Sequence, residues 1–147
     1  MSLQGVRNGM IAILTGASAF DANQVSGCDY GVLETSDSCA LLVMPIGIAS
    51  EPITFGAPRA RLITWELEVQ AYVKDTGNPV AVLGNLWTIA DEVRGALDSD
   101  DTLSGSCKKA KITGATQPKG EGRGPGAIEA GGAVWFPWYF TVAADEF

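Results

Sequence analysis

The sequence predicts an α+β domain in which two α-helices pack on a single mixed, mainly antiparallel β-sheet, in the order α-β-β-β-α-β-β. Residues 63–73 alternate between apolar and polar side chains, which is the period of two of a half-buried strand. Residues 3–20 and 79–97 instead repeat apolar side chains at spacings of three and four, the period of an amphipathic helix. Because 147 residues with 46% apolar side chains suffice for one core, a single domain spanning residues 1–147 is expected.

The first helix is expected at residues 3–20. Its apolar face consists of Leu3, Val6, Met10, Ile13, Leu14 and Ala17. Gly5, Gly9 and Gly16 each lower the intrinsic helix propensity by roughly 1 kcal/mol. This helix therefore needs tertiary support, and its glycines allow close approach to a sheet or a neighbouring chain.

Three strands are expected next. Residues 39–45 are apolar on both faces, so this strand should lie inside the sheet or be covered on both sides. A short strand is expected at 52–55, followed by a turn at 56–58. That turn leads back into the long alternating strand at 63–73, which makes an antiparallel pair.

The second helix is expected at residues 79–97. Pro79 suits the first helical position, and Asn78 is a good N-cap residue. The apolar stripe of this helix consists of Val82, Leu83, Leu86, Trp87, Ala90, Val93 and Leu97. The acidic run at 98–101 opposes the helix dipole, so we expect a solvated turn there.

A strand is expected at 107–116, where the local group of Lys108, Lys109 and Lys111 is typical of a solvated sheet edge that resists aggregation. The following residues, 117–132, are rich in Gly, Pro and charge, which predicts a flexible loop.

The last strand is expected at 133–142 and carries aromatic side chains on both faces. Trp135 and Tyr139 share one of these faces. Pro137 lies inside the strand and lacks a backbone donor, which indicates an edge position or a bulge.

Composition excludes several classes of protein. The net charge is −7 and the ten Lys and Arg residues are mostly scattered, so stable sequence-specific DNA binding is not expected. The longest apolar run, at 39–49, is too short and too interrupted to span a bilayer. No signal peptide is recognisable at the amino end, and a cytosol-like compartment is expected.

No catalytic constellation is present, and neither a cofactor nor a metal is expected. The chain has no histidine, which removes Ser-His-Asp, Cys-His and imidazole zinc sites. The acidic run at 98–101 resembles a calcium loop, but Lys109 occupies the position of the bidentate Glu. Asp91 and Glu92 are adjacent on a helix and point apart, as on a solvated face. An enzyme is therefore not expected.

The chain has three cysteines, Cys28, Cys39 and Cys107. An odd number leaves one thiol over under any pairing, and buried free thiols are the expected state. A Cys28–Cys39 bridge is also compatible with the sequence.

Residues 63–73, the helix at 79–97 with Trp87, and the closing strand at 134–142 together resemble the tail terminator (tail completion, head–tail joining) proteins of long-tailed bacteriophages. The resemblance implies a small subunit without cofactor or catalytic residues that forms a six-membered ring on the tail tube. Such a ring stops tube polymerisation and offers the docking surface for the head connector. It lies at the head-proximal end of the virion tail and is assembled in the host cytoplasm.

The resemblance also suggests roles for single residues. Glu66 and Glu68 are candidates to line a lumen through which DNA passes without specific binding, or they are ordinary solvent-facing strand residues. Lys119, Glu121 and Arg123 are candidates to contact the tail tube protein or the head connector, or they belong to a surface insertion.

Trp135 and Tyr139 are candidates for a subunit interface within the ring; the alternative is packing inside their own chain. Other readings of the whole chain also stay open. These are a neck adaptor, a tail tube subunit, or a small-ligand or peptide-binding module that uses the aromatic strand as one wall of its pocket.

Overall fold

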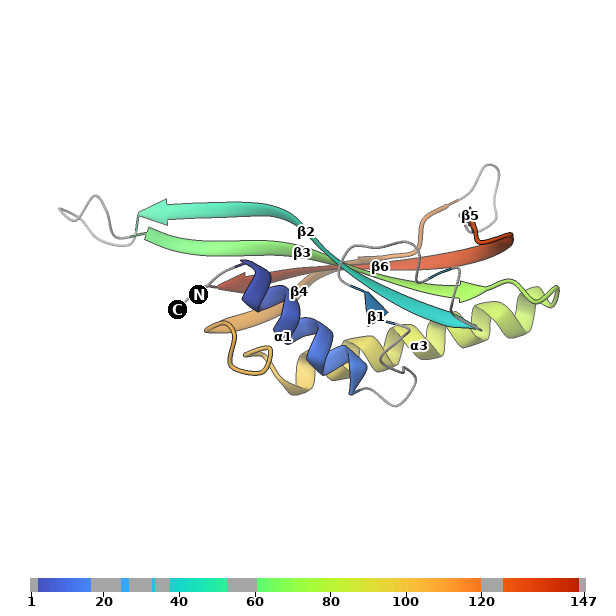
Figure 1. Cartoon of the computed structure of the whole chain (residues 1–147), viewed down its shortest axis with the longest axis horizontal. Helices are drawn as coiled ribbons and strands as arrows, with labels where there is room; N and C mark the ends of the chain where they lie inside the picture. Colours follow the sequence, from blue (N-terminus) through green and yellow to red (C-terminus); the bar gives the residue numbers. More distant parts are fainter. Residues whose placement is uncertain are drawn as a thin grey trace.

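The computed structural model describes residues 3–16, 25–26, 33, 38–52, 61–119 and 126–145. Within these residues the helices are α1 (Leu3–Thr15) and α3 (Pro79–Ser99). The strands are β1 (Val25–Ser26), β2 (Cys39–Pro52), β3 (Arg61–Lys74), β4 (Lys109–Thr116), β5 (Ile128–Ala130) and β6 (Ala133–Asp145). Both helices pack on one face of a twisted sheet (Figure 1). The predicted α+β class is confirmed.

The sheet has the strand order β1-β2-β3-β6-β4, and β5 pairs with β6 as well. All neighbours are antiparallel except β1 and β2, which run parallel over two residue pairs. The strand expected at 39–45 is longer than predicted, because β2 passes through a register shift between Pro45 and Gly47 and continues to Pro52, the first residue of the strand expected at 52–55. Residues 53–55 lie outside the described part of the chain.

The β2–β3 hairpin is much longer than expected and projects past α1 at the left of Figure 1. We call residues 46–52 of β2 and 61–66 of β3 the arm. Along the arm the two strands stay in register from Gly47 opposite Glu66 to Pro52 opposite Arg61. The end of the arm, residues 50–52 opposite 61–63, is two-stranded, whereas residues 64–66 also pair with β6.

The main core lies between the helices and the sheet. It collects Leu67, Val69, Ala71 and Val73 of β3, Val6, Met10 and Leu14 from the predicted face of α1, and most of the predicted stripe of α3. Its largest fully buried members are Val6, Met10, Leu14, Leu41, Val43, Leu67, Leu86 and Leu103. The helix residues predicted at 17–20 are outside the described part of the chain.

Trp87 does not belong to the core stripe, so that prediction is wrong. Its side chain is 52% exposed, whereas Ile89 is only 8% exposed. Successive helix positions differ by about 100°, so the residue next to a buried position can face outward. Trp87 turns away from the sheet, and its indole N–H donates to Oε1 of Gln117 at 3.5 Å.

The start of α3 agrees with the prediction. Pro79 occupies the first turn, and Oδ1 of Asn78 accepts the backbone N–H of Ala81 at 3.4 Å. The helix ends at Ser99, two residues beyond the expected end, and the acidic run continues into a turn.

A second, smaller core lies on the sheet face away from the helices, which we call the outer face. It buries Leu33, Ala40, Leu42, Tyr72 and Trp135, with Tyr139 packed against them. The expectation of a half-buried β3 therefore holds only for part of the strand, because Tyr72 is 1% exposed.

Part of the predicted loop at 117–132 is in fact ordered as β5, which forms a hairpin with β6. Gly131 and Gly132 connect the two strands with φ angles of 59° and 75°. Two successive positive φ angles characterise a type I′ turn, which matches the twist of a hairpin. Gly131 and Gly132 are thus a turn signal, whereas from the sequence all glycines of this segment are taken as a sign of flexibility.

Pro137 is expected at an edge position or a bulge, but β6 is a central strand and its register with β3 runs through Pro137 without a shift. The backbone N–H of Asp75 donates to the carbonyl of Val134 at 2.8 Å, which places Pro137 and its partner Tyr72 in a non-hydrogen-bonded pair. The ring nitrogen therefore faces the other side, at the break between the β4 and β5 pairs. The proline occupies the place on β6 where no donor is required.

Candidate functional site

The outer face of β3 carries the acidic residues proposed for a lumen. Glu66, Glu68, Gln70 and Tyr72 alternate with the core residues of the strand and so point away from the helices. Glu66 is exposed and Glu68 is half-buried. The structure thus brings the two predicted carboxylates together on the face that the helices leave uncovered.

A chain of hydrogen bonds orients Glu68. The hydroxyl of Tyr72 donates to Oε1 of Gln70 at 2.7 Å, and Nε2 of Gln70 donates to Oε1 of Glu68 at 2.7 Å. Gln70 is only 7% exposed, so its amide is held by the packing around it. The carboxylate of Glu68 therefore has a fixed direction along the strand, beside the second core.

Glu66 takes a different direction, across the hairpin. A Cβ built at Gly47, its partner on β2, would lie 3.4 Å from Oε2 of Glu66. The carboxylate therefore leans over the glycine, towards the free side of β2. A Cβ at position 47 would be in van der Waals contact with this carboxylate.

Trp135 is not available as a subunit-interface residue in this structure, so that candidate is corrected. Its side chain is 0% exposed, and its indole N–H donates to the carbonyl of Ala130 at 3.1 Å. The ammonium of Lys74 lies 5.4 Å from the ring centroid, in the range of a cation–π contact. The alternative reading, packing within its own chain, is what the structure shows for this tryptophan.

Tyr139 packs against the second core but stays half-buried. Its ring meets that of Tyr72 edge to face, with centroids 6.4 Å apart. The structure thus leaves part of Tyr139 accessible, and its role at an interface stays a prediction.

Of the three loop candidates, Lys119 is exposed at the end of the segment after β4. Glu121 and Arg123 lie outside the described residues. The backbone N–H of Gly126 donates to the carbonyl of Pro118 at 2.7 Å. This bond brings the two ends of the intervening segment together beside Lys119.

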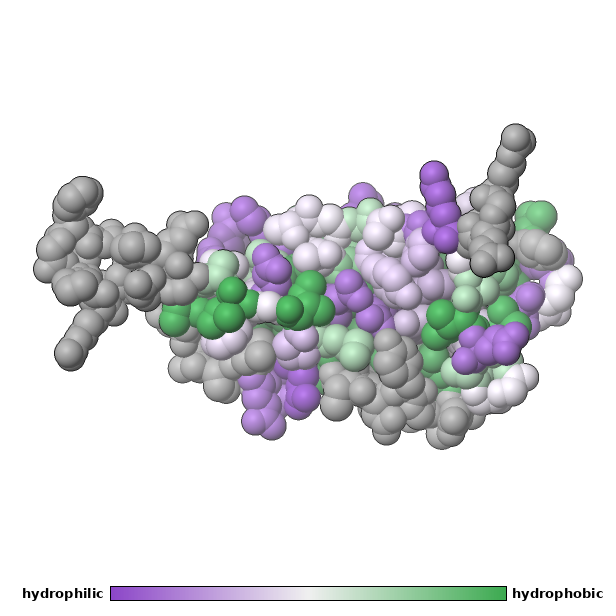
Figure 2. Space-filling view, turned by 90° about the horizontal axis from the view of Figure 1, so that it is seen from above, coloured by the Kyte–Doolittle hydropathy of each residue, from purple (hydrophilic) through white to green (hydrophobic). Residues whose placement is uncertain are grey.

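The arm carries exposed apolar side chains that the sequence reasoning missed. Ile46 is 51% exposed and Ile48 is 56% exposed. Ile48 pairs with Trp65, whose buried indole nitrogen finds no hydrogen-bond partner among the described residues. Figure 2 looks down on the arm and shows hydrophobic residues gathered beside the grey segment at its left end. In the sequence, the continuous apolar run at 39–49 is the pattern from which these exposed side chains could be predicted.

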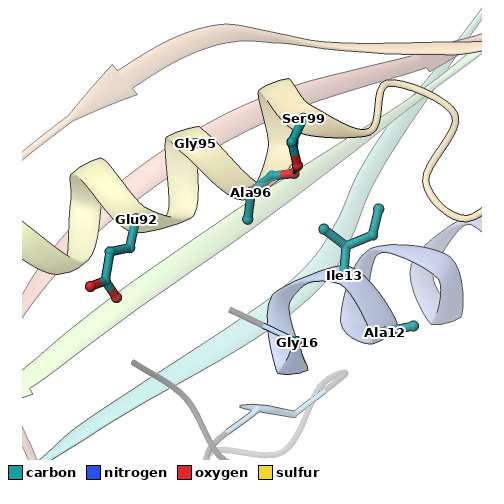
Figure 3. A pocket seen from close by; sticks show the side chains of 7 residues that line it. All are labelled: Ala12, Ile13, Gly16, Glu92, Gly95, Ala96 and Ser99. Carbon is teal, nitrogen blue, oxygen red and sulfur yellow. Dashed lines mark hydrogen bonds between the residues drawn. The ribbon is translucent and has the colours of Figure 1, made fainter. Parts of the chain in front are cut away.

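An open groove of about 430 Å³ lies between the end of α1 and α3 (Figure 3). It is lined by Ala12, Ile13, Gly16, Glu92, Gly95, Ala96 and Ser99. One carboxylate oxygen of Glu92 is buried without a hydrogen-bond partner in the described part of the chain, whereas Asp91 pairs with Arg94 at 3.5 Å on the exposed side. Glu92 is thus half-buried at the groove, whereas Asp91 is exposed as expected.

Glu92 and Ser99 are the polar side chains among the described residues that line this groove. The hydroxyl of Ser99 donates to the carbonyl of Ala96 at 2.8 Å, and none of the described residues that line the walls is basic.

The acidic run after α3 forms a hydrogen-bonded turn. Asp100 accepts bonds from the hydroxyl and the backbone N–H of Thr102 at 2.7 and 3.1 Å, and from the backbone N–H of Ser104 at 3.1 Å. These bonds lower the pKa of the Asp100 carboxyl below its usual value. Among the residues that the structure describes, no cluster of His, Cys, Asp or Glu is grouped to hold a metal ion.

Cys107 is a buried free thiol. Burial, with the carboxylates of Asp100, Asp101 and Asp145 nearby, raises the pKa of this thiol to about 11. It is therefore a poor nucleophile at neutral pH. Cys39 is also buried, and Cys28 lies outside the described residues.

Comparison with protein-family models and with curated proteins finds no match to this chain. No helix in the described residues is long and apolar enough to cross a membrane.

Proposed function

We propose that this chain is a structural phage tail protein, a tail terminator that forms a ring, caps the tail tube and provides the docking surface for the head connector. The proposal begins from the resemblance of residues 63–73, 79–97 and 134–142 to that family. The fold agrees with the expected small α+β subunit.

The observation that carries the proposal is the uncovered acidic part of the outer face. Both helices pack on the opposite side of the sheet, so a ring with its helices outside would turn Glu66 and Glu68 towards its centre. Negative charge on a lumen repels the phosphate backbone and lets DNA pass without sticking. The net charge of −7 favours the same behaviour over the rest of the surface.

The described residues give less support to the alternative of a ligand-binding module. That reading needs the aromatic strand as a pocket wall, but Trp135 is fully packed inside the chain. The groove between α1 and α3 lies on the other side of the sheet and has one carboxylate among small side chains.

The direct test is a tube-capping assay. The tail tube protein encoded in the same genome is polymerised with and without this chain, and tube lengths and ends are imaged by electron microscopy. We expect shorter tubes that carry a six-fold ring at one end. Unchanged tubes with bare ends would overturn the proposal. Long tubes made of this chain alone would identify a tube subunit, and binding to the connector without any effect on tubes would identify a neck adaptor.

The lumen assignment has its own test. Reversing both charges, Glu66→Lys with Glu68→Lys, should reduce DNA ejection and infectivity because phosphates would then adhere to the wall. The neutral pair Glu66→Gln with Glu68→Gln serves as the control and should have a smaller effect. Normal ejection in the charge-reversed particles would remove these residues from the lumen.

A further inference from the structure

We infer that copies of this chain join edge to edge, with β4 of one copy pairing antiparallel to the β2 side of the arm of the next, so that the sheet continues from subunit to subunit. The inference rests on the proposed ring and names the contact that builds it. The partner is a second copy of this chain.

The first support is that both edges of the described sheet, at β2 and at β4, have unpaired stretches. β1 pairs with β2 only at Leu41 and Leu42. From Gly47 to Pro52, β2 has β3 on one side and no strand on the other among the described residues. β4 likewise has β6 on one side only in the described sheet. Open strand edges present rows of backbone donors and acceptors that pair readily with another chain.

The second support is the apolar surface of the arm. Ile46 and Ile48 are each more than half exposed, and they lie on the open strand of the arm. β4 also has an exposed stretch, which consists of its last residues from Thr113 to Thr116. Apolar side chains on an open edge strand are a strong aggregation hazard in a monomer. Pairing with a second copy would cover them.

The third support is strand direction. β2, β3, β6 and β4 are successively antiparallel, so β4 runs opposite to β2. A neighbouring copy related by rotation about an axis along the strands therefore presents its β2 antiparallel to β4. The continued sheet keeps the helices of every copy on the same side. Such a head-to-tail contact closes into a ring when the rotation divides a full turn.

Charge complementarity identifies the partner as a second copy. Gly47, Glu66, Ala143 and Lys111 form one transverse row across the sheet. Glu66 leans over Gly47 towards the β2 edge, and Lys111 is exposed at the β4 edge. The same row thus ends in an acid at one edge and a base at the other.

Lys111 also lies on the same face of the sheet as Glu66. Its neighbours Ala110 and Ile112 both contact the helix-side core, so Lys111 points to the outer face. When β4 of one copy lies beside β2 of the next, Lys111 meets Glu66 at the same level. Gly47 places no side chain between them.

The experiment is a charge swap measured by sedimentation velocity on the full chain over a range of concentrations. We expect Glu66→Lys and Lys111→Glu each to raise the concentration for half-assembly by about tenfold or more. Each variant places two like charges opposite each other, at residue 66 of one copy and residue 111 of the next. The double variant restores the pair with reversed polarity and should assemble within a few-fold of the wild type. Glu129→Lys, on the exposed side of β5, is the control and should assemble normally.

A second variant tests the apolar surface of the arm independently of the Glu66–Lys111 pair. Ile48→Lys adds a charge to the exposed arm and should also weaken assembly, while circular dichroism shows an unchanged fold. Assembly that is insensitive to all of these changes, or a double variant no better than the single ones, would overturn the edge contact even where rings form. A chain that stays monomeric up to about 1 mM would overturn it as well. The tube-capping assay judges the proposed function separately, because it scores tube ends.

Discussion

Gly9 of α1 lies directly against the backbone carbonyl oxygen of Leu103, in the turn that follows α3. A Cβ at position 9 would overlap that oxygen and Oγ of Ser106. Leu103 is fully buried and, with a φ of 50°, adopts a left-handed conformation that is uncommon for a residue with a side chain. The contact explains why a glycine stands at this position of α1.

We therefore expect Gly9→Ala to destabilise the protein by roughly 1–3 kcal/mol, because overpacking against backbone outweighs the gain in helix propensity. The matched control is Gly84→Ala in α3, where a Cβ would meet nothing within 4 Å. That change should instead stabilise by up to about 1 kcal/mol. Urea unfolding of both variants measures the difference. Equal stabilisation by both substitutions would show that the turn at Leu103 moves away from a Cβ at position 9 without a loss of stability.

Local sequence periodicity predicted much of the fold because the signals for helices and strands are local. The apolar faces of α1 and β3, and the start of α3 at Asn78 and Pro79, follow from spacing and capping alone. Periodicity does not say which neighbour covers a given face. It therefore misplaced Trp87, which lies one helix step from the buried Leu86, and it could not show that a second core buries Trp135.

The two tryptophans make a matched pair for stability. Trp135→Ala should cost about 3–5 kcal/mol, because it empties a fully buried site and removes the bond to Ala130. Trp87→Ala should change stability by less than about 1 kcal/mol, since Trp87 is 52% exposed. Denaturant unfolding followed by circular dichroism compares the two. A small cost at Trp135 would mean that the second core is loosely packed.

The candidate site was only partly predictable for a related reason. Glu66 and Glu68 could be assigned to one face from alternation alone. The reach of Glu66 over Gly47 depends on the register of β2 after its irregularity near Pro45, and nothing in the sequence reports that register. In the same way, the row that ends in Lys111 exists only because β6 lies between β3 and β4.

The turn at Asp100 predicts a dependence on acid. The hydroxyl of Thr102, and the backbone N–H groups of Ser104 and Thr102, lower the pKa of this carboxyl below 3.8. Its contribution to stability is therefore complete above pH 3.8 and is lost as the pH falls through the folded-state pKa. Asp100→Ala should lower the melting temperature at pH 7, and its difference from wild type should shrink in strong acid. Asp98→Ala, an exposed neighbour, is the control and should change little at either pH.

Cys107 predicts the opposite dependence at alkaline pH. Its thiol has a pKa of about 11 in the folded chain against 9.0 for the unperturbed group, mainly because it is buried. The unfolded chain thus loses this proton first, so the free energy of unfolding should decline as the pH rises from about 9 to about 11. Cys107→Ala removes this part of the slope, and the difference between the two unfolding curves isolates it from other groups. At pH 8 only about one thiol in a thousand is ionised, so iodoacetamide should modify Cys107 in urea long before it does so in the native protein. Rapid labelling of the native chain at Cys107 would show that the turn around Asp100 opens readily.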